Sequence, residues 1–503
     1  MPDIKKDSLL LAVLFVIFYN LSFYPFNLFF LAPISFFILL LFIEKCQSKV
    51  FAKSILLFYP FYAFHTFWIL HLKTDPGIEK YLIIGLILLP AYLSIYTALF
   101  VMFTKKILNI KKGTLLLIPS LWVILEYIKS TGPLGFPWMN LYYSQLENRT
   151  IVALASWGGP YFLSFLIVLT GYLLFRIFKR PDKTHIYSTG IFLFALLAFG
   201  NIAKEQLKNL PHNSSIKIAV LQPNILPTNI YDPKEWLKTK DSLLFLAQKI
   251  KDDSVELIVL SESAIPGYFR YSFRAHKLLG EISRITGADI LFGTQDKRKK
   301  DGKYRVFNTA MLIHKGRIID QYDKHHLVPF GEWLPYQYKL PAPLREINLG
   351  WGDFYPGDIK PVEINSHKIG ILICFESIFP EISRKLTKMG AEMLFVITND
   401  GWFGKSKGPL EHFQMSRLRA VETGRYLVRS AKTGVSAVIS PEGKVLEKLP
   451  LFTKGFFVYR VPFIRKKTIY TRIGNVIVLL SFLIVLVFLV YNNPYTIKER
   501  RHN

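Results

Sequence analysis

Cysteine is almost absent from this sequence, which has only Cys46 and Cys374 among its 503 residues. So low a count excludes a disulfide-rich fold, and no run of cysteines and histidines has the spacing of a zinc site. The sequence also lacks a GxxxxGK[ST] motif and a GxGxxG motif after a strand, so nothing indicates a nucleotide site. We therefore expect neither a metal nor a cofactor. A lone cysteine often packs as a small hydrophobic residue, and Cys374 needs further support before it is given a role.

Acidic residues are scarce as well, with 36 Asp and Glu against 63 Lys and Arg, which gives a formal net charge of +27. Such an excess is found in nucleic-acid-binding proteins, in proteins on anionic lipid, and in membrane proteins with basic cytoplasmic loops. The chain is 51% hydrophobic and 15% aromatic, and this is more apolar than a soluble protein. We therefore expect a lipid bilayer rather than a nucleic acid as its partner.

Long apolar runs divide the sequence into three parts. Several approach the ~20 residues that a transmembrane helix needs. We predict about eight spans, at Leu9–Phe23, Phe26–Ile43, Ile55–Leu72, Tyr81–Phe103, Leu115–Ile128, Gly158–Phe178, Ile186–Ile202 and Ile473–Tyr491. The predicted parts are a seven-span bundle at 1–210, a polar region at 211–465, and a last span with a tail at 466–503.

The basic residues between the spans indicate an orientation. If the N-terminus is cytoplasmic, the inside loops and the C-terminal tail carry most of the Lys and Arg, as the positive-inside rule requires. These loops contain Lys45, Lys49 and Lys53, then Lys105, Lys106, Lys111 and Lys112, then Lys179, Arg180 and Lys183. Both termini would then be cytoplasmic, and residues 211–465 would lie outside the cytoplasm, which in a bacterium-like cell means the periplasmic or outer face. Cys374 would be a lone thiol in an oxidising compartment, separated from Cys46.

The polar region has the pattern of an α/β domain, because short apolar strands alternate with helical stretches. We predict strands at 216–222, 256–262, 289–294, 308–314, 369–376, 393–400, 426–434 and 436–445. Helices are predicted at Trp236–Lys251, Phe273–Thr286, Ile378–Met389 and Leu410–Thr423. Polar residues end three of the strands, namely Glu262, then Cys374 and Glu376, then Asn399 and Asp400. Ligands of open α/β sheets bind beyond the carboxyl ends of the strands, so we expect the site there.

Acyl transfer by a thiol needs a nucleophile, a base for its proton, and a group that stabilises the oxyanion. The segment "LSESAIPG" contains Glu262, "YDKHHLVPFGEWLP" contains Lys324 and Glu332, and "ICFE" contains Cys374. The order Glu, Lys, Cys resembles that of the nitrilase superfamily. Only this resemblance implies that the three side chains meet.

Two further segments, "TNDGWFGKSKGPLEHFQMSRLRAVE" and "TGVSAVISPEGKV", follow the seven predicted spans. With them, the whole chain resembles the bacterial apolipoprotein N-acyltransferase family. The resemblance implies a periplasmic nitrilase-like αββα sandwich attached to a transmembrane bundle in the inner membrane. It also implies transfer of an acyl chain from a phospholipid to the α-amino group of the diacylglyceryl-modified N-terminal cysteine of an apolipoprotein.

The same resemblance implies roles for five residues. Cys374 would be the nucleophile that carries the acyl group as a thioester in a ping-pong scheme, and Glu262 the general base. Lys324 would be the cation beside the oxyanion. Glu332 and Glu376 would be supporting acids.

Aromatic residues are expected to form the walls of the substrate site. The family usually has Tyr after the nucleophile and Trp before an Asp-Pro pair, where this sequence has Phe375 and Tyr231. Trp402, Trp333 and Trp138 are further candidates for contact with the substrate. The aromatic stretch 333–355 is expected to be either a mobile lid over Cys374 or a fixed wall.

Two other functions are compatible with parts of the sequence. A membrane-anchored nitrilase-type amidase would use the same triad but needs only a tether, so it leaves seven spans unexplained. A transporter or channel would have charged residues inside its spans, and Glu126 is the clearest example, with His65 and His71 nearer the edge of another span. One acid is little support for an ion path.

Overall fold

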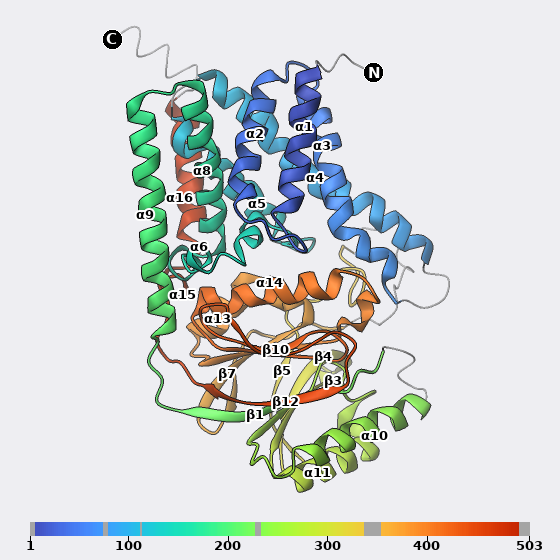
Figure 1. Ribbon diagram of the computed structural model, residues 1–503. Coiled ribbons are helices and arrows are strands. Elements are labelled where there is room, and N and C mark those ends of the chain that lie inside the picture. The colour runs from blue at the N-terminus through green and yellow to red at the C-terminus, as the bar shows by residue number, and fades with distance from the viewer. Residues whose placement is uncertain (1–5, 74–78, 111–112, 227–232, 337–353, 492–503) are drawn as a thin grey trace. The chain divides into compact units, whose positions relative to one another are not determined.

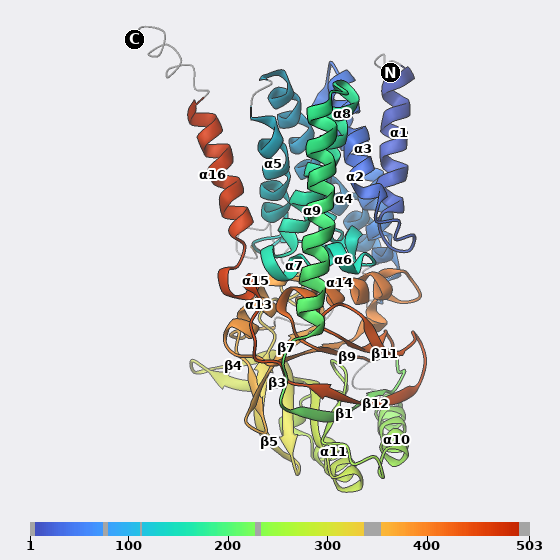
Figure 2. The ribbon, with the colours of Figure 1, turned by 60° about the vertical axis from the view of Figure 1, so that its left-hand side comes forward.

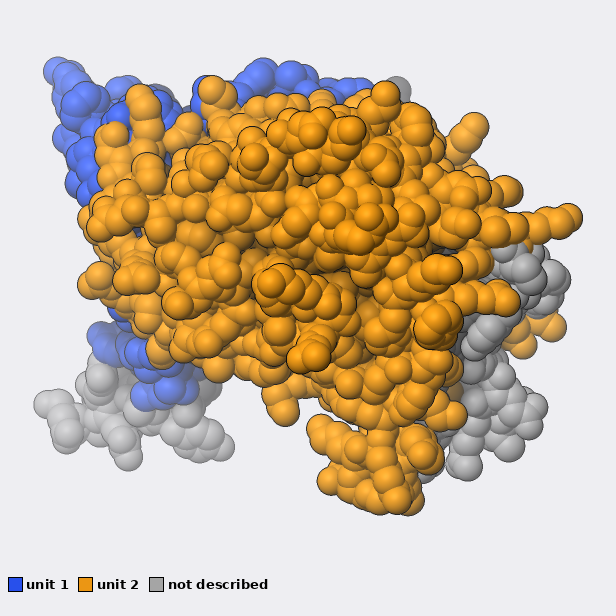
Figure 3. Space-filling model, turned by 90° about the horizontal axis from the view of Figure 1, so that it is seen from below, with its two compact units in different colours: residues 1–67, 83–206, 473–503 blue, residues 68–82, 207–472 orange. Residues whose placement is uncertain are grey.

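The computed structural model describes residues 6–73, 79–110, 113–226, 233–336 and 354–491 (Figure 1). The chain forms two compact units, shown in different colours in Figure 3. The first comprises Met1–Phe67, Ile83–Gln206 and Ile473–Asn503, and the second comprises Trp68–Leu82 and Leu207–Arg472. The boundaries predicted at 210 and 465 stay a prediction.

The first unit is helical, and long helices overlap the eight apolar runs of the sequence, one helix for each run. They are α1 (Lys6–Leu21), α2 (Leu31–Lys45), α3 (Val50–Thr66), α4 (Glu79–Ile110), α5 (Thr114–Lys129), α8 (Pro160–Lys179), α9 (Lys183–Lys208) and α16 (Val476–Tyr491). Short helical turns lie between some of them: η2 (Leu141–Gln145), α6 (Arg149–Val152) and α7 (Ala155–Gly158). A further turn, η1 (Phe67–His71), follows α3, and its residues from Trp68 onward belong to the second unit. Aromatic side chains pack between the helices, for example Tyr19 against Phe61, whose ring centroids lie 4.5 Å apart.

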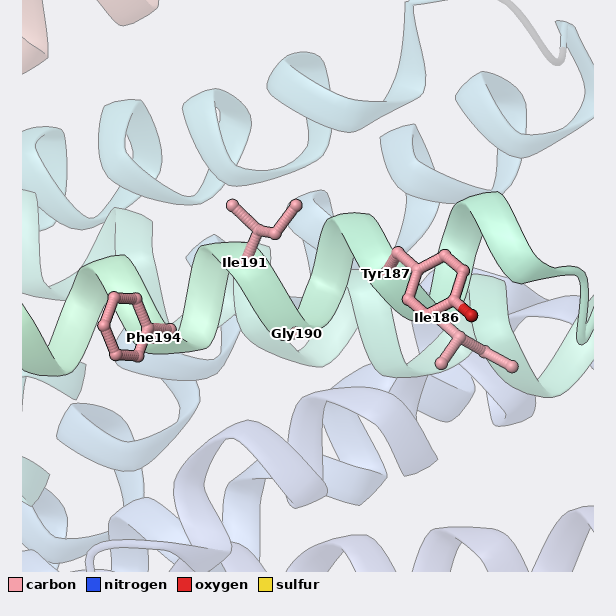
Figure 4. Close-up of a pocket in the computed structure, with 5 residues that line it drawn as sticks. All are labelled: Ile186, Tyr187, Gly190, Ile191 and Phe194. Atoms are coloured by element: carbon pink, nitrogen blue, oxygen red, sulfur yellow. The ribbon is translucent and has the colours of Figure 1, made fainter.

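Within the described residues, three helices are long and apolar enough to cross a membrane, namely α4, α8 and α9. Shorter apolar helices cover Ser8–Leu21 and Val476–Tyr491. A hollow on α9 is lined by Ile186, Tyr187, Gly190, Ile191 and Phe194 (Figure 4). Phe194 is 75% exposed, which suits contact with lipid rather than water. These helices fit a membrane protein, and the number of about eight spans stays a prediction.

The second unit contains two six-stranded sheets. The first has the order β12-β1-β2-β3-β4-β5, with β1 (Ser215–Gln222), β2 (Leu257–Val259), β3 (Asp289–Lys300), β4 (Lys303–His314), β5 (Arg317–Asp323) and β12 (Gly455–Pro462). The second has the order β11-β10-β9-β8-β7-β6, with β6 (Val362–Ile364), β7 (His367–Ile373), β8 (Met393–Thr398), β9 (Leu427–Ala431), β10 (Ser436–Ile439) and β11 (Val445–Leu449). In each sheet three neighbouring strands are parallel, β1-β2-β3 and β7-β8-β9. Figure 2 shows β12 beside β1, with which it pairs in antiparallel fashion.

Helices cover the outer faces of both sheets, so the second unit is an αββα sandwich. The helices are α10 (Pro233–Lys249), α11 (Phe273–Thr286), α13 (Pro380–Lys388) and α14 (Gly408–Thr423), with shorter turns at η3 (Phe269–Tyr271), η5 (Cys374–Ile378), η6 (Asp400–Phe403) and α15 (Ile469–Ile473). Buried residues of the two inner faces, such as Leu291 and Phe395, share one core. A second core lies between the first sheet and its helices, and Leu279 and Phe292 belong to it. The predicted nitrilase-like fold is thus confirmed.

The strands differ from the predicted ones in two respects. β5, β6, β11 and β12 were not predicted. β5 carries charges among its apolar residues, β6 has three residues, and the single strand predicted at 436–445 is β10 followed by a turn, with β11 beginning at Val445. The strand predicted at 256–262 is ladder-paired only over Leu257–Val259. Glu262 therefore lies in the loop after β2 and not at the last position of the strand.

Phe395 lies on β8 in the core between the sheets and is 0% exposed. Replacing it with alanine leaves a cavity, so Phe395→Ala should lower the free energy of unfolding of this unit by about 3–5 kcal/mol. Phe273 is 81% exposed, and Phe273→Ala should change it by less than about 0.5 kcal/mol. Denaturant unfolding of the purified protein, followed by circular dichroism, measures both. Equal effects of the two substitutions would contradict this packing.

Candidate active site

Lys324 is the centre of a buried charge cluster at the end of β5. Its side chain is 1% exposed, and Nζ lies 2.9 Å from Oε1 of Glu332 and 3.6 Å from Oε1 of Glu262. Burial alone would lower the pKa of Lys324, but the carboxylates of Glu332 and Glu262 outweigh it and raise the pKa above its ordinary value. Lys324 is therefore a permanent cation.

Glu262 is held by groups from two other strands. Nδ2 of Asn308, on β4, donates to Oε1 at 2.8 Å, and the backbone N–H of Asn399, after β8, donates to Oε2 at 2.9 Å. The backbone of Glu262 is also held, because it packs directly against Gly293 on β3. A side chain at that glycine would not fit, since its Cβ would lie 2.6 Å from Cα of Glu262. The carboxylate is thus presented in one orientation.

Glu332 completes the cluster from the segment after Lys324. Its Oε1 also accepts a hydrogen bond from Nδ2 of Asn308, at 2.8 Å, so one amide joins the two carboxylates. Its Oε2 accepts from the backbone N–H of Val328 at 2.8 Å. Glu332 therefore pairs with Lys324, and it also holds the backbone of the loop between Lys324 and Glu332.

Cys374 comes directly after β7 and is partly exposed. Its φ of +51° lies in the left-handed region, which is rare for a residue with a side chain and typical of functional turns. Burial raises the pKa of the Cys374 thiol well above its usual range, the charge of Glu262 raises it further, and the charge of Lys324 lowers it. The resting sulfur is therefore a thiol, and it needs a base to become a nucleophile.

Glu376 binds the backbone on both sides of the site. Its Oε2 accepts from the N–H of Ile373 at 2.7 Å. Its Oε1 accepts from Tyr322 Oη at 2.8 Å and from the N–H groups of His325 and His326 at 2.8 and 3.1 Å. It is 0% exposed, so it anchors β7 to the segment after β5 rather than meeting a substrate.

Aromatic rings lie beside the nucleophile. Phe375 packs edge-on against Phe379, with ring centroids 5.1 Å apart, and the ring of His326 lies 3.9 Å from that of Phe379. Burial lowers the pKa of His326 to about 4, with smaller contributions from His325 and Lys324, so its ring is neutral. These rings form an apolar wall. Because position 375 is phenylalanine, the wall lacks the hydroxyl that a tyrosine there would provide.

The remaining predicted substrate contacts stay predictions. Trp333 follows Glu332, and its Nε1 donates to the carbonyl of Leu327 at 3.2 Å. Trp402 lies in η6 and is half-buried. Trp138 belongs to the first unit, where it is 1% exposed and stacks on Phe136. Tyr231 and most of the expected lid, 337–353, lie outside the described residues.

Sequence reasoning missed Asn308, which bridges the two carboxylates. A strand was predicted to begin at this residue, but a single asparagine at the start of an apolar strand was not singled out. The described residues contain no group of three or more His, Cys, Asp or Glu side chains that could hold a metal ion. The chemistry that these residues offer is a thiol, a base and a fixed cation, the set needed for acyl transfer.

The sequence is similar to two protein families and to full-length bacterial proteins. Residues 217–467 match the carbon-nitrogen hydrolase family, and residues 16–173 match the apolipoprotein N-acyltransferase N-terminal domain. An apolipoprotein N-acyltransferase of Geobacter metallireducens is 33% identical over 492 residues, which cover 95% of this chain and 94% of that protein. One from Shewanella oneidensis is 30% identical over 406 residues, 77% of this chain and 76% of that protein.

Among solved structures, a carbon-nitrogen hydrolase from Helicobacter pylori shares 19% identity with a TM-score of 0.38, covering 49% of this chain and 89% of that chain. That likeness is too remote to add to the argument. The sandwich and the first family match define a carbon-nitrogen hydrolase domain. The N-terminal match and the full-length relatives go further: the chain belongs to the apolipoprotein N-acyltransferase family.

Opposite charges beside Cys374 should shift its reactivity in opposite directions. Glu262→Gln removes a negative charge and should lower the pKa of the thiol, whereas Lys324→Met removes a positive charge and should raise it. The pH at which iodoacetamide alkylation is half-maximal should move down in the first variant and up in the second. Intact mass spectrometry in a Cys46→Ser background measures it, and shifts in the same direction would contradict the charge arrangement.

Proposed function

We propose that this protein is an N-acyltransferase of lipoproteins. It takes an acyl chain from a phospholipid and transfers it to the α-amino group of a diacylglyceryl-modified N-terminal cysteine. The observation that carries the proposal is the arrangement of Lys324, Glu262 and Glu332 beside Cys374, in a chain whose N-terminal part matches the domain specific to this family.

In the first half-reaction the donor is a phospholipid ester. Glu262 accepts the proton of the Cys374 thiol while sulfur attacks the ester carbonyl carbon, and the carbonyl oxygen becomes an oxyanion. The carbon–oxygen bond to glycerol then breaks, and the proton on Glu262 passes to the leaving glycerol oxygen. The products are a thioester on Cys374 and a lysophospholipid.

In the second half-reaction the acceptor is the neutral α-amine of the lipoprotein. The nitrogen attacks the thioester carbonyl carbon, Glu262 takes a proton from the nitrogen, and the carbon–sulfur bond breaks. The thiolate leaves and recovers a proton from Glu262. The thioester keeps the acyl group reactive between the two steps, so the ping-pong scheme requires no nucleotide.

Lys324 is assigned to the charge that develops in both steps. An ammonium that is already fixed by Glu332 and Glu262 requires little reorganisation when an oxyanion forms nearby. Asn308 and Glu332 act on the substrate only through Lys324 and Glu262. Phe375 and the neighbouring rings are assigned to acyl-chain contact.

The expected partners follow from this chemistry: a phospholipid donor, a diacylglyceryl-apolipoprotein acceptor and the lipid bilayer. We assign the chain to the bacterial inner membrane with about eight spans, both termini cytoplasmic and the sandwich periplasmic. The distribution of Lys and Arg between the spans supports this orientation. A substrate that is itself lipid-linked accounts for a large apolar helical unit.

The two other candidate functions have less support. An amidase would not account for the match at 16–173 to the N-acyltransferase N-terminal domain. A transporter would use Glu126, but Oε1 of that residue accepts a hydrogen bond from the backbone N–H of Leu141 at 2.5 Å. This contact gives Glu126 a role in holding the loop after α5.

Incubation with phospholipid should add the mass of one acyl chain to the wild-type protein. A diacylglyceryl-cysteine peptide added afterwards should remove that mass and gain it on its amine. Cys374→Ala should show neither change, because it lacks the sulfur, and Cys46→Ser should behave like the wild type. Intact mass spectrometry follows both molecules. An acyl group lost to water but never to the peptide would favour the amidase.

The orientation can be tested by labelling introduced cysteines with a membrane-impermeant maleimide. Both native cysteines are first removed by Cys46→Ser and Cys374→Ser. One variant then carries Lys297→Cys, at an exposed position on β3, and another carries Lys183→Cys, at an exposed position at the start of α9. The first should react in spheroplasts, and the second only after lysis. The reverse pattern would overturn the proposed orientation.

A further inference from the structure

A buried polar network lies behind the nucleophile and has no role in the steps above. It consists of His412 on α14, Asp400 after β8, Arg429 on β9 and Ser377 in η5, which are each at most 1% exposed. Nδ1 of His412 lies 2.9 Å from Oδ1 of Asp400, and Nε2 lies 2.9 Å from Oγ of Ser377. Nε2 also lies 3.1 Å from the carbonyl oxygen of Cys374 itself.

The backbone of Cys374 needs such support. Its φ of +51° is unfavourable for a residue with a Cβ and persists only where the surroundings impose it. Two side chains hold the backbone on either side of this residue. Glu376 accepts a hydrogen bond from the N–H of Ile373, which precedes Cys374, and His412 contacts the carbonyl of Cys374. A carbonyl oxygen only accepts, so this contact is a hydrogen bond when Nε2 carries the proton. Burial lowers the pKa of His412, so the ring is neutral, and its Nδ1 then accepts from Nη2 of Arg429 at 3.2 Å.

The histidine is itself held firmly. Oδ1 of Asp400 also accepts from Thr398 Oγ1 at 2.9 Å, and Oδ2 accepts from Nη2 of Arg429 at 2.7 Å. Burial opposes the charge of Asp400, but Arg429 and His412 outweigh it and hold its pKa well below the usual range. Asp400 therefore acts through Arg429: it holds the guanidinium, whose Nη2 lies 3.2 Å from Nδ1 of His412 and fixes the imidazole ring.

The order Ser377, His412, Asp400 resembles a serine-hydrolase triad. Such a triad carries its proton on Nδ1, whereas the contact of His412 with the carbonyl of Cys374 requires it on Nε2. Ser377 is 0% exposed, however, and its hydroxyl is therefore closed to a substrate. Besides the backbone of the nucleophile, the network borders its sulfur, because burial raises the pKa of the Cys374 thiol and the charge of Asp400 raises it further. Thr398, which donates to Asp400, hydrogen-bonds that thiol. The role of the network is thus to position, not to react.

We propose that His412 is a positioning residue for the acyl transfer: supported by Asp400 through Arg429, it holds the carbonyl of Cys374 so that the sulfur stays in line with Glu262. The expected effect of His412 on the rate of acyl transfer rests on the proposed function. The expected effect on the reactivity of the Cys374 sulfur rests on geometry alone.

Two substitutions separate the two sides of the ring. The amide of His412→Gln reaches the position of Nε2 and can donate to the carbonyl of Cys374. The amide of His412→Asn reaches only the position of Nδ1 and keeps the contact with Arg429. Both place a neutral polar group in the same buried space, so they are matched controls for the fold.

We expect His412→Gln to keep kcat within about threefold of the wild type, and His412→Asn to lose about 10–100-fold, as small misplacements of reacting groups do. KM should change less than about twofold, and the Tm values of the two variants should agree. The rate at which iodoacetamide alkylates Cys374 should fall in the same order. Equal kcat in the two variants, or losses that follow Tm instead of side-chain reach, would overturn the proposal.

Alkylation keeps the inference separate from the proposed function. If no variant, including the wild type, transfers an acyl group, the proposed function fails. The ratio of alkylation rates between His412→Asn and His412→Gln then still tests the positioning, because alkylation needs only the thiol. A ratio of one would refute the role of His412 whatever reaction the protein catalyses.

Discussion

The site depends on one constraint, which is that the ammonium of Lys324 is buried and must stay charged. A buried charge is tolerated only when it is paired and hydrogen-bonded, and losing one partner of such a pair costs about 3–5 kcal/mol. Lys324 meets this condition through Glu332 at 2.9 Å and Glu262 at 3.6 Å. Asn308 prevents the two carboxylates from separating, because it donates to both. The general base and the cation are therefore one rigid group.

The two-sheet architecture explains how distant parts of the sequence form this group. Glu262 follows β2 and Lys324 follows β5 in the first sheet, whereas Cys374 follows β7 in the second. The two sheets share one core between them, so a shift of either sheet would disturb the thiol and the base together. Glu376 adds a direct tie, since it binds the N–H of Ile373 in one sheet and the hydroxyl of Tyr322 in the other.

Much of the fold could be predicted from the sequence where local signals are strong. Helix α11 begins and ends as predicted, because Ser272 caps it by accepting from the N–H of Ala275 and Gly287 ends it with a φ of +72°. The meeting of Glu262, Lys324 and Cys374 could be inferred only from a resemblance, since spacing along the chain does not encode contacts between sheets. His412 and Asn308 lay within a predicted helix and a predicted strand. Their importance arises from tertiary contacts that no local pattern reveals.

If Cys374 carries the acyl chain between donor and acceptor, the donor half-reaction should run in both directions without any acceptor, which an exchange experiment can measure. Wild-type protein is incubated with phospholipid and isotopically labelled lysophospholipid, with no lipoprotein or peptide present. If a thioester forms reversibly, label should appear in phospholipid, and Cys374→Ala should abolish the exchange. Exchange that occurs only when the acceptor peptide is present would contradict the claim, because it would show that donor and acceptor must bind together.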